Sequence, residues 1–228
     1  MHRITLGEQQ LLLLPDRALY WPTHKAVVVA DIHLGKGASF REQGLPLPQG
    51  GTQTDLDRLS RLIHDQQAEQ LLVLGDLIHG GARQPEQRWI AQAQLWREQH
   101  AQLQLHWVVG NHDRAPEELA RRWRAELIRE GAQWSGVQLW HHPSEDLSQP
   151  SLGGHWHPVA RIQPGARQRL RLPVFWLEQH RLVLPAFGSL TGGHPVAPTP
   201  HTHLWACAEQ HIIALQRLHH GFAPRSTR

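Results

Sequence analysis

The 228-residue chain contains a single cysteine, a single methionine and a single tyrosine. One cysteine, Cys207, excludes a disulfide framework and a thiolate metal cluster, and its alternating surroundings over 203–208 predict a small buried side chain. No apolar run approaches the ~20 residues needed to cross a bilayer. The apolar stretch 11–14 is followed by Pro15 and Asp16, so the hydrophobic region of a secretory signal is missing. We therefore expect a globular, soluble protein of the cytoplasm with no membrane association.

Histidine and tryptophan are abundant instead, with 19 and 10 residues. The histidines direct attention to metal or proton chemistry. Charge is unevenly distributed: residues 151–228 hold eight arginines, no lysine and two acids, giving +6, which leaves −3 for the first 150 residues of a chain with net charge +3. A basic C-terminal third is typical of proteins that bind a polyanion such as nucleic acid, although a solvated basic face would have the same composition.

Apolar runs that end abruptly in polar, metal-capable residues organise the chain. They are residues 26–30, 71–74, 107–109 and 137–140. Such runs predict buried strands of an α/β sheet, at whose carboxyl ends ligands gather. Amphipathic stretches predict helices over 54–67, 85–100 and 116–129, and strand-like segments over 169–176, 181–185 and 203–208 predict a second sheet. We expect one domain over 1–220, a frayed tail over 221–228, and substrate-facing loops over 35–51 and 191–202.

The polar residues after these runs form an ordered set of motifs. They are Asp31 and His33 (D-x-H), Gly75 and Asp76 (GD), GNHD at 110–113, His141, and G-H-W-H at 154–157. Carboxylates, imidazoles and an amide oxygen suit Mn²⁺, Fe or Zn²⁺, and their number indicates two metal ions that share one carboxylate. Residues two apart on an extended segment point to the same side, so each D-x-H or H-x-H pair can direct two donors at one site. Each motif is weak alone, but the ordered set is a strong signal.

The complete set resembles the calcineurin-like metallophosphoesterase superfamily. The resemblance implies a four-layer α-β-β-α sandwich in which two mixed sheets are flanked by helices. It implies that Asp31, His33, Asp76 and His157 hold a first metal ion, and that Asp76, Asn111, His141 and His155 hold a second, with Asp76 as the bridge. His112 would be the acid near the leaving oxygen, and Asp113 would orient its ring.

A closer resemblance covers nearly the whole chain. Residues 31–59, HHP at 141–143, HWHP at 155–158 and LPAFGSLTGG at 184–193 are similar to the ligase-associated DNA damage response endonucleases. This branch implies a manganese-dependent DNA endonuclease or phosphodiesterase in bacterial DNA repair. It also implies a functional association with a DNA ligase, a helicase and an exonuclease-like protein.

Several alternatives stay open at this stage. His141 is favoured over the adjacent His142 as ligand, and His79 is interpreted as a plain loop residue. Arg114 and Arg41 are candidates for contacting substrate phosphate, because guanidinium groups match phosphate oxygens. The alternative function is a phosphatase or pyrophosphatase acting on a small nucleotide-like phosphoester. An idle scaffold is disfavoured because no ligand is missing, and a pure DNA-binding module is disfavoured because no helix-turn-helix or zinc-finger spacing is present.

Overall fold

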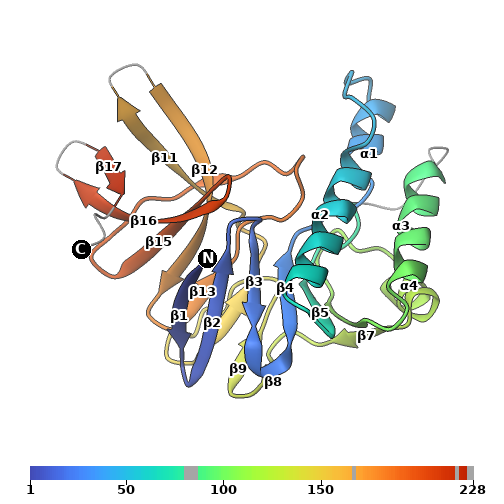
Figure 1. Ribbon diagram of the computed structural model, residues 1–228, viewed down its shortest axis with the longest axis horizontal. Helices are drawn as coiled ribbons and strands as arrows, with labels where there is room; N and C mark the ends of the chain where they lie inside the picture. Colours follow the sequence, from blue (N-terminus) through green and yellow to red (C-terminus); the bar gives the residue numbers. More distant parts are fainter. Residues whose placement is uncertain (80–86, 166–167, 219–220, 225–228) are drawn as a thin grey trace.

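Two mixed β-sheets packed face to face form the body of the protein (Figure 1). This computed structural model describes residues 1–79, 87–165, 168–218 and 221–224. The first sheet has seven strands in sequence order: β1 (His2–Leu6), β2 (Gln9–Leu14), β3 (Ala18–Trp21), β4 (Ala26–Ala30), β5 (Gln70–Leu74), β6 (Gln104–Val108) and β7 (Ala125–Ile128). Strands β1 to β4 are antiparallel and β4 to β7 are parallel, so β4, β5 and β6 end at the same edge.

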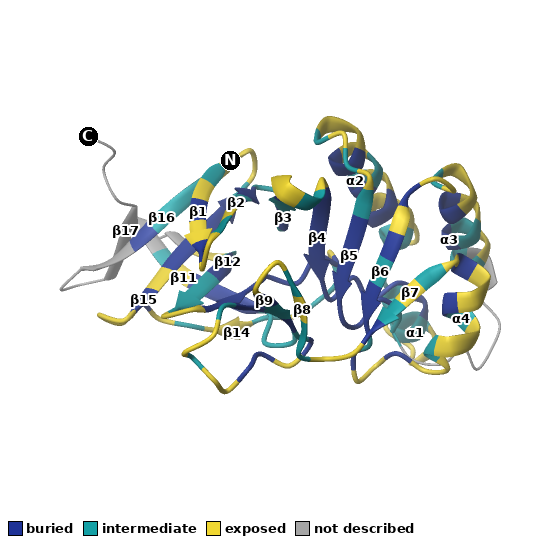
Figure 2. Ribbon diagram, turned by 90° about the horizontal axis from the view of Figure 1, so that it is seen from below, coloured by how far each residue is buried: buried dark blue, intermediate teal, exposed yellow. Residues whose placement is uncertain are grey.

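Helices cover the outer face of this sheet. They are α1 (Lys36–Glu42), α2 (Gly51–Asp65), α3 (Gln87–Gln99) and α4 (Pro116–Trp123), and a 3-10 turn η1 (Pro22–His24) precedes β4. Leu56, Leu59 and Ile63 recur at helical spacing on α2, and they pack with Val27 and Val29 of β4 in one buried cluster. The alternate β4 residues face the second sheet, which explains why every residue of β4 is buried (Figure 2).

The second sheet contains ten strands. They are β8 (Ala132–Trp134), β9 (Val137–Leu139), β10 (Ser151–Gly153), β11 (Pro158–Gly165), β12 (Gln168–Glu178), β13 (Arg181–Val183), β14 (His194–Pro195), β15 (Thr202–Ala208), β16 (His211–Leu218) and β17 (Gly221–Pro224). The strand order is β17-β16-β15-β12-β13-β10-β9-β8, and β11 pairs with β12 and β14. The long β12 pairs with β11 up to Pro173 and with β15 from Val174 onward. Its first half thereby extends into a β11–β12 hairpin beyond the sandwich (Figure 1).

The predicted α/β sandwich of two mixed sheets flanked by helices is confirmed. The run 26–30 coincides with β4, and the other apolar runs fall on β5, β6 and β9. The predicted helices over 54–67 and 85–100 correspond to α2 and α3. In the described part of the chain, no helix has both the length and the hydropathy needed to cross a membrane.

Three details differ from the expectations. The predicted helix over 116–129 ends at Trp123, because Arg124 adopts a left-handed backbone and the next residues pair with β6 as β7. The predicted loop over 35–51 contains α1. Part of the tail predicted over 221–228, Gly221–Pro224, pairs with β16 as strand β17; residues 225–228 lie outside the described residues.

Candidate metal centre

The parallel strands of the first sheet bring three of the motifs to one edge. Asp31 follows β4, Gly75 and Asp76 follow β5, and the GNHD motif follows β6. The turns are tied together, because Asp31 N donates to Gly75 O at 3.2 Å and His33 N donates to Asp76 O at 2.9 Å. Ligand sites at the carboxyl ends of parallel strands are the expected consequence of this arrangement.

The second sheet supplies the histidines. His141 follows β9, and His155 and His157 follow β10. Gly154 N donates to His141 O at 3.0 Å, and His155 N donates to Asp31 Oδ2 at 2.8 Å. The two sheets therefore meet at this point, with the carboxylate of Asp31 between them.

The donor atoms form two overlapping groups. Asp31, His33 and His157 can each offer one donor atom to a first group, and Asp31, Asp76 and His141 to a second, with the atoms of each group within 4.8 Å of one another. Asp76 reaches both sides: its Oδ2 is 3.7 Å from His33 Nε2 and its Oδ1 is 3.7 Å from His141 Nε2. This is the geometry expected of a bridging carboxylate.

The remaining predicted ligands complete the second group. His141 Nε2 lies 2.9 Å from Asn111 Oδ1 and 3.1 Å from His155 Nδ1. Asp31 also touches both groups, with its Oδ1 at 3.3 Å from His157 Nε2 and 3.8 Å from His141 Nδ1. The structure thus brings together all the residues that the sequence predicts as ligands.

Buried donor atoms without hydrogen-bond partners show that these residues fit a metal centre. Asp31 Oδ1, both ring nitrogens of His33 and His157 Nε2 are buried and have no hydrogen bond among the described residues. Burying polar atoms without partners is costly, and bound cations would offset that cost. Burial, together with the neighbouring Lys36 and His157, lowers the pKa of His33 to about 2. His33 is therefore neutral, which is the form that binds a metal.

The ligand backbones have unusual conformations. Asp31, His33, Asp76, His155 and His157 all have positive φ angles, between 45° and 63°. The D-x-H and H-x-H spacing predicts extended segments. The backbone instead turns tightly at each predicted ligand. Non-glycine residues rarely adopt this region, and such residues cluster at functional sites.

Glycines provide the room around the ligands. A Cβ atom on Gly110 would overlap the backbone N and Oδ1 of Asp76, and one on Gly154 would lie 2.7 Å from Asp31 Oδ2. The glycines of the GNHD and G-H-W-H motifs are therefore required because carboxylates pack directly against them.

The neighbouring histidines 141 and 142 have different environments. His141 is fully buried and lies 3.3 Å from Leu74 O through Nδ1. The side chain of His142 is 52% exposed, lies 3.4 Å from Glu130 Oε1, and its ring is 4.2 Å from that of His155. This geometry favours His141 as the ligand. His142 can also join His141 and His155 in a three-residue group, so it lies beside the second position.

His112 lies at the open side of the cluster. The residue is exposed, its backbone N donates to Asp76 Oδ1 at 2.8 Å, and its ring is 5.4 Å from that of His33. This position allows a substrate bound at the donor groups to meet the imidazole.

Asp113 does not have the contact that the sequence suggested. Its carboxylate accepts hydrogen bonds from Ile78 N at 2.9 Å, Trp107 Nε1 at 3.0 Å and Gly110 N at 2.8 Å. Among the described residues no hydrogen bond joins it to the ring of His112. Burial raises the pKa of Asp113 to about 7, against the lowering effect of the three donors. Asp113 thus fixes the loop that carries His112 rather than its ring.

His79, interpreted from the sequence as a plain loop residue, faces the cluster. Its ring is 5.2 Å from that of His112 and 5.3 Å from that of His33, and its backbone N donates to Leu34 O at 3.0 Å. Burial, followed by nearby Lys36 and His112, lowers the pKa of His79 to about 4. Its position three residues after Asp76 was the only signal in the sequence.

Three cationic side chains near the motifs, Lys36, Arg41 and Arg114, have different surroundings. Burial lowers the pKa of Lys36, while Asp31 and Asp76 act in the opposite direction, so its ammonium group lies in the field of the cluster. Arg41 donates to Pro48 O at 3.1 Å and lines a cavity with Trp89 on the α1–α2 side. Arg114 is exposed just before α4. Phosphate contacts by Arg41 and Arg114 stay predictions.

Two solved structures resemble the chain to different degrees. The chain is 35% identical to Pseudomonas putida nuclease MPE, whose crystal structure matches with a TM-score of 0.77 over 90% of this chain and 96% of that chain. YfcE, a phosphoesterase from E. coli, matches at 17% identity with a TM-score of 0.45, over 83% of this chain and 96% of that one. A search of curated proteins found no match.

The family comparison covers the metal centre itself. Residues 24–180 match the calcineurin-like phosphoesterases. This range includes every motif from Asp31 to His157, and the structure gathers those motifs at one edge of the sandwich. The chain therefore belongs to the calcineurin-like phosphoesterase family.

Proposed function

We propose that the protein is a dimetal-dependent phosphodiesterase that cleaves DNA, with Mn²⁺ as its preferred ion. One observation carries the proposal: two overlapping groups of carboxylate and imidazole donors share Asp31, and the carboxylate of Asp76 lies 3.7 Å from a histidine of each group. The similarity to a nuclease over 90% of the chain favours a polynucleotide over a small phosphoester. A donor set of oxygen and nitrogen atoms without a thiolate is compatible with manganese.

The residues divide into holding and reacting groups. Asp31, His33, Asp76 and His157 would hold the first ion, and Asp76, Asn111, His141 and His155 the second. Two bound ions would supply charge stabilisation for the phosphoryl oxygens and lower the pKa of a water molecule. His112 stands at the open side, where it can donate a proton to the departing oxygen. Asp113 keeps its loop in place.

The biological setting is part of the same proposal. The resemblance to the ligase-associated branch suggests a role in bacterial DNA repair in the cytoplasm. It also suggests functional association with a DNA ligase, a helicase and an exonuclease-like protein. The basic C-terminal third of the chain, with its net charge of +6, is consistent with a nucleic-acid substrate.

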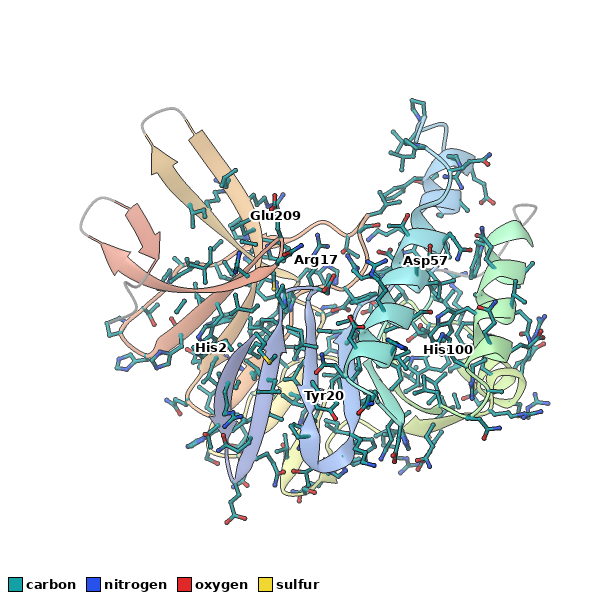
Figure 3. All side chains as sticks on the ribbon, in the orientation of Figure 1. His2, Arg17, Tyr20, Asp57, His100 and Glu209 are labelled. Carbon is teal, nitrogen blue, oxygen red and sulfur yellow. The ribbon has the colours of Figure 1, made fainter. Side chains whose placement is uncertain are left out.

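Cleavage of a circular single-stranded DNA tests the proposal. The metal-stripped protein would be resupplied with Mn²⁺, Mg²⁺ or Zn²⁺, and a nitrophenyl phosphodiester would be assayed in parallel. Asp76→Asn should abolish both activities, whereas Asp57→Asn, an exposed position on α2 (labelled in Figure 3), should retain them. Mn²⁺-dependent linearisation is the expected result. Hydrolysis of the small diester with intact DNA would overturn the DNA assignment and indicate a nucleotide-like substrate.

A further inference from the structure

A cavity of about 190 Å³ lies directly beside His157. Arg17, in the turn between β2 and β3 (labelled in Figure 3), and Arg171, on β12, both line it. The rest of its wall comes from β11 and from the loop over 186–193, including Thr191 and Gly193. This loop belongs to the LPAFGSLTGG segment, which contributes none of the predicted metal ligands.

The loop is anchored to the backbone of two predicted metal ligands. Gly188 N donates to Asp31 O at 3.1 Å, and beyond the other end of the loop His194 N donates to His157 O at 2.9 Å. A Cβ atom on Gly188 would overlap Ile32 O, so the backbones make close contact. The position of the cavity is therefore fixed relative to the metal centre.

A second anchor comes from α2. The buried carboxylate of Asp55 accepts hydrogen bonds from Ser189 N at 3.0 Å and Ser189 Oγ at 3.1 Å. Arg58 lies 3.1 Å from Asp55 and also donates to Phe187 O. Charged hydrogen bonds from α2 thus hold the cavity wall in place. They keep the cavity in a defined shape before a ligand binds.

The charged side chains that line the cavity, Arg17 and Arg171, are both cationic. Arg171 lies directly opposite Arg161 in the antiparallel β11–β12 pair, which puts both exposed side chains on the same face. Like charges in this arrangement are destabilising unless an anion lies between them. In the described residues, no carboxylate is within ion-pair distance of Arg17, Arg161 or Arg171. Arg17 and Arg171 each donate to a loop carbonyl, of Gly188 and Gly193, which leaves other N–H groups of each fork for a ligand.

We propose that this cavity binds a backbone phosphate of a polynucleotide, adjacent to the phosphodiester that lies at the metal centre. Arg17 and Arg171 bind that phosphate through their guanidinium groups, and Arg161 extends the path of the strand along the β11–β12 hairpin. This inference rests on the proposed DNA substrate. It identifies the feature that distinguishes a polynucleotide from a small diester, which has no second phosphate.

Substrate comparison tests the subsite. Arg171→Ala and Arg161→Ala would be compared with Arg3→Ala, an exposed arginine on β1, in cleavage of a single-stranded oligonucleotide and of a nitrophenyl phosphodiester. For Arg171→Ala we expect kcat/KM for DNA to fall about tenfold relative to kcat/KM for the diester, because one charged contact to phosphate is lost. Arg161→Ala should shift the same ratio in the same direction, and it removes no hydrogen bond to the loop. Equal losses on both substrates, or ratios matching Arg3→Ala, would overturn the subsite.

The salt dependence of binding gives an independent readout. Oligonucleotide binding to the His112→Ala holoenzyme, whose cleavage is expected to be slow, would be measured with and without Arg171→Ala. Losing one phosphate contact on a single strand should reduce the slope of log K against log salt by about 0.7. Tight binding without cleavage by the wild type, with the reduced slope, would refute the DNA cleavage and keep the subsite. Cleavage with an unchanged slope would keep the DNA cleavage and refute the subsite. Absence of both binding and cleavage would refute the DNA cleavage and the subsite together.

Discussion

Gly75 packs against the imidazole of His141 so closely that no Cβ atom fits between them. A Cβ on Gly75 would overlap Nδ1 and Cγ of His141, and it would lie 2.7 Å from Cβ of that histidine. Gly75 also has a φ of 80°, where an L side chain is strained. The glycine of the GD motif therefore does more than turn the chain before Asp76. It lets a histidine from the second sheet reach the carboxylates of the first.

Replacing this glycine should disable the second metal position. In Gly75→Ala the new methyl group pushes the ring of His141 away from Asp76 and Asn111, so we expect a loss of bound metal and a fall in activity of at least tenfold, in line with displaced metal ligands and their supports. Metal content after gel filtration, together with diester hydrolysis, would measure both effects. Gly136→Ala is the matched control, since Gly136 has a φ of 81° and open space around it. Full metal occupancy in Gly75→Ala would contradict the steric argument.

Local patterns predicted the elements that carry the site. The buried run of β4 and the apolar spacing of α2 depend on contacts that each element makes along its own length, so period and composition are sufficient to identify them. The end of α4 was not predictable in this way. Leu127 continues the apolar spacing of the helix but belongs to β7, and only pairing with β6 reveals the change. Tertiary contacts override a helical pattern there.

That the predicted ligands lie together was predictable, because each motif follows a strand and the strands end at one edge of the sandwich. The environment of each side chain was not. The partners of Asp113 come from β6 and from the turn after Asp76, and His79 faces His112 because the turn after β5 contacts the turn after β6. Likewise, no spacing connects Arg17 with Arg171, which the fold brings to one cavity. Long-range contacts of this kind have no signature in a single sequence.

The leaving group should reveal the role of His112. His112→Ala removes the proposed proton donor, so turnover of an ester with an alkoxide leaving group should fall about 10²–10⁴-fold. A nitrophenyl diester should be affected much less, because nitrophenolate departs without a proton. His64→Ala, an exposed residue on α2, controls for loss of a histidine as such. Metal content should match the wild type. Normal turnover of the alkoxide ester by His112→Ala would exclude the acid role.

The metal-stripped protein should lose stability as the pH falls from 7 to 5. Burial lowers the pKa of His33 to about 2 and that of His79 to about 4, from 6.5, so in this window the unfolded chain takes up protons at both histidines that the folded chain does not. Asp113 acts in the opposite direction, because burial raises its pKa from 3.8 to about 7 and the folded chain holds that proton. Summed over these three groups, the unfolded state binds up to about one proton more as the pH approaches 5, so their contribution to stability rises with pH in this window.

Urea unfolding at pH 7, 6 and 5 measures this dependence. From these three groups, one net proton corresponds to at most about 1.4 kcal/mol per pH unit. His79→Gln should flatten the profile, because it removes one of the two groups that protonate only on unfolding. A midpoint that stays constant, or that increases toward pH 5, would show that the histidines of the metal-free cluster are not held neutral by burial.

Removing the charge of Asp55 should loosen the loop over 186–193 without touching the metal ligands. In Asp55→Asn one oxygen becomes an NH₂ group that faces N–H donors, and Arg58 loses its buried counter-charge. Since an unsatisfied buried group costs roughly 1–3 kcal/mol, the free energy of unfolding should fall by about that amount. Asp57→Asn, two residues further along α2 and exposed, should change it by less than about 0.5 kcal/mol. Equal stability of the two variants would mean that Asp55 does not anchor the loop.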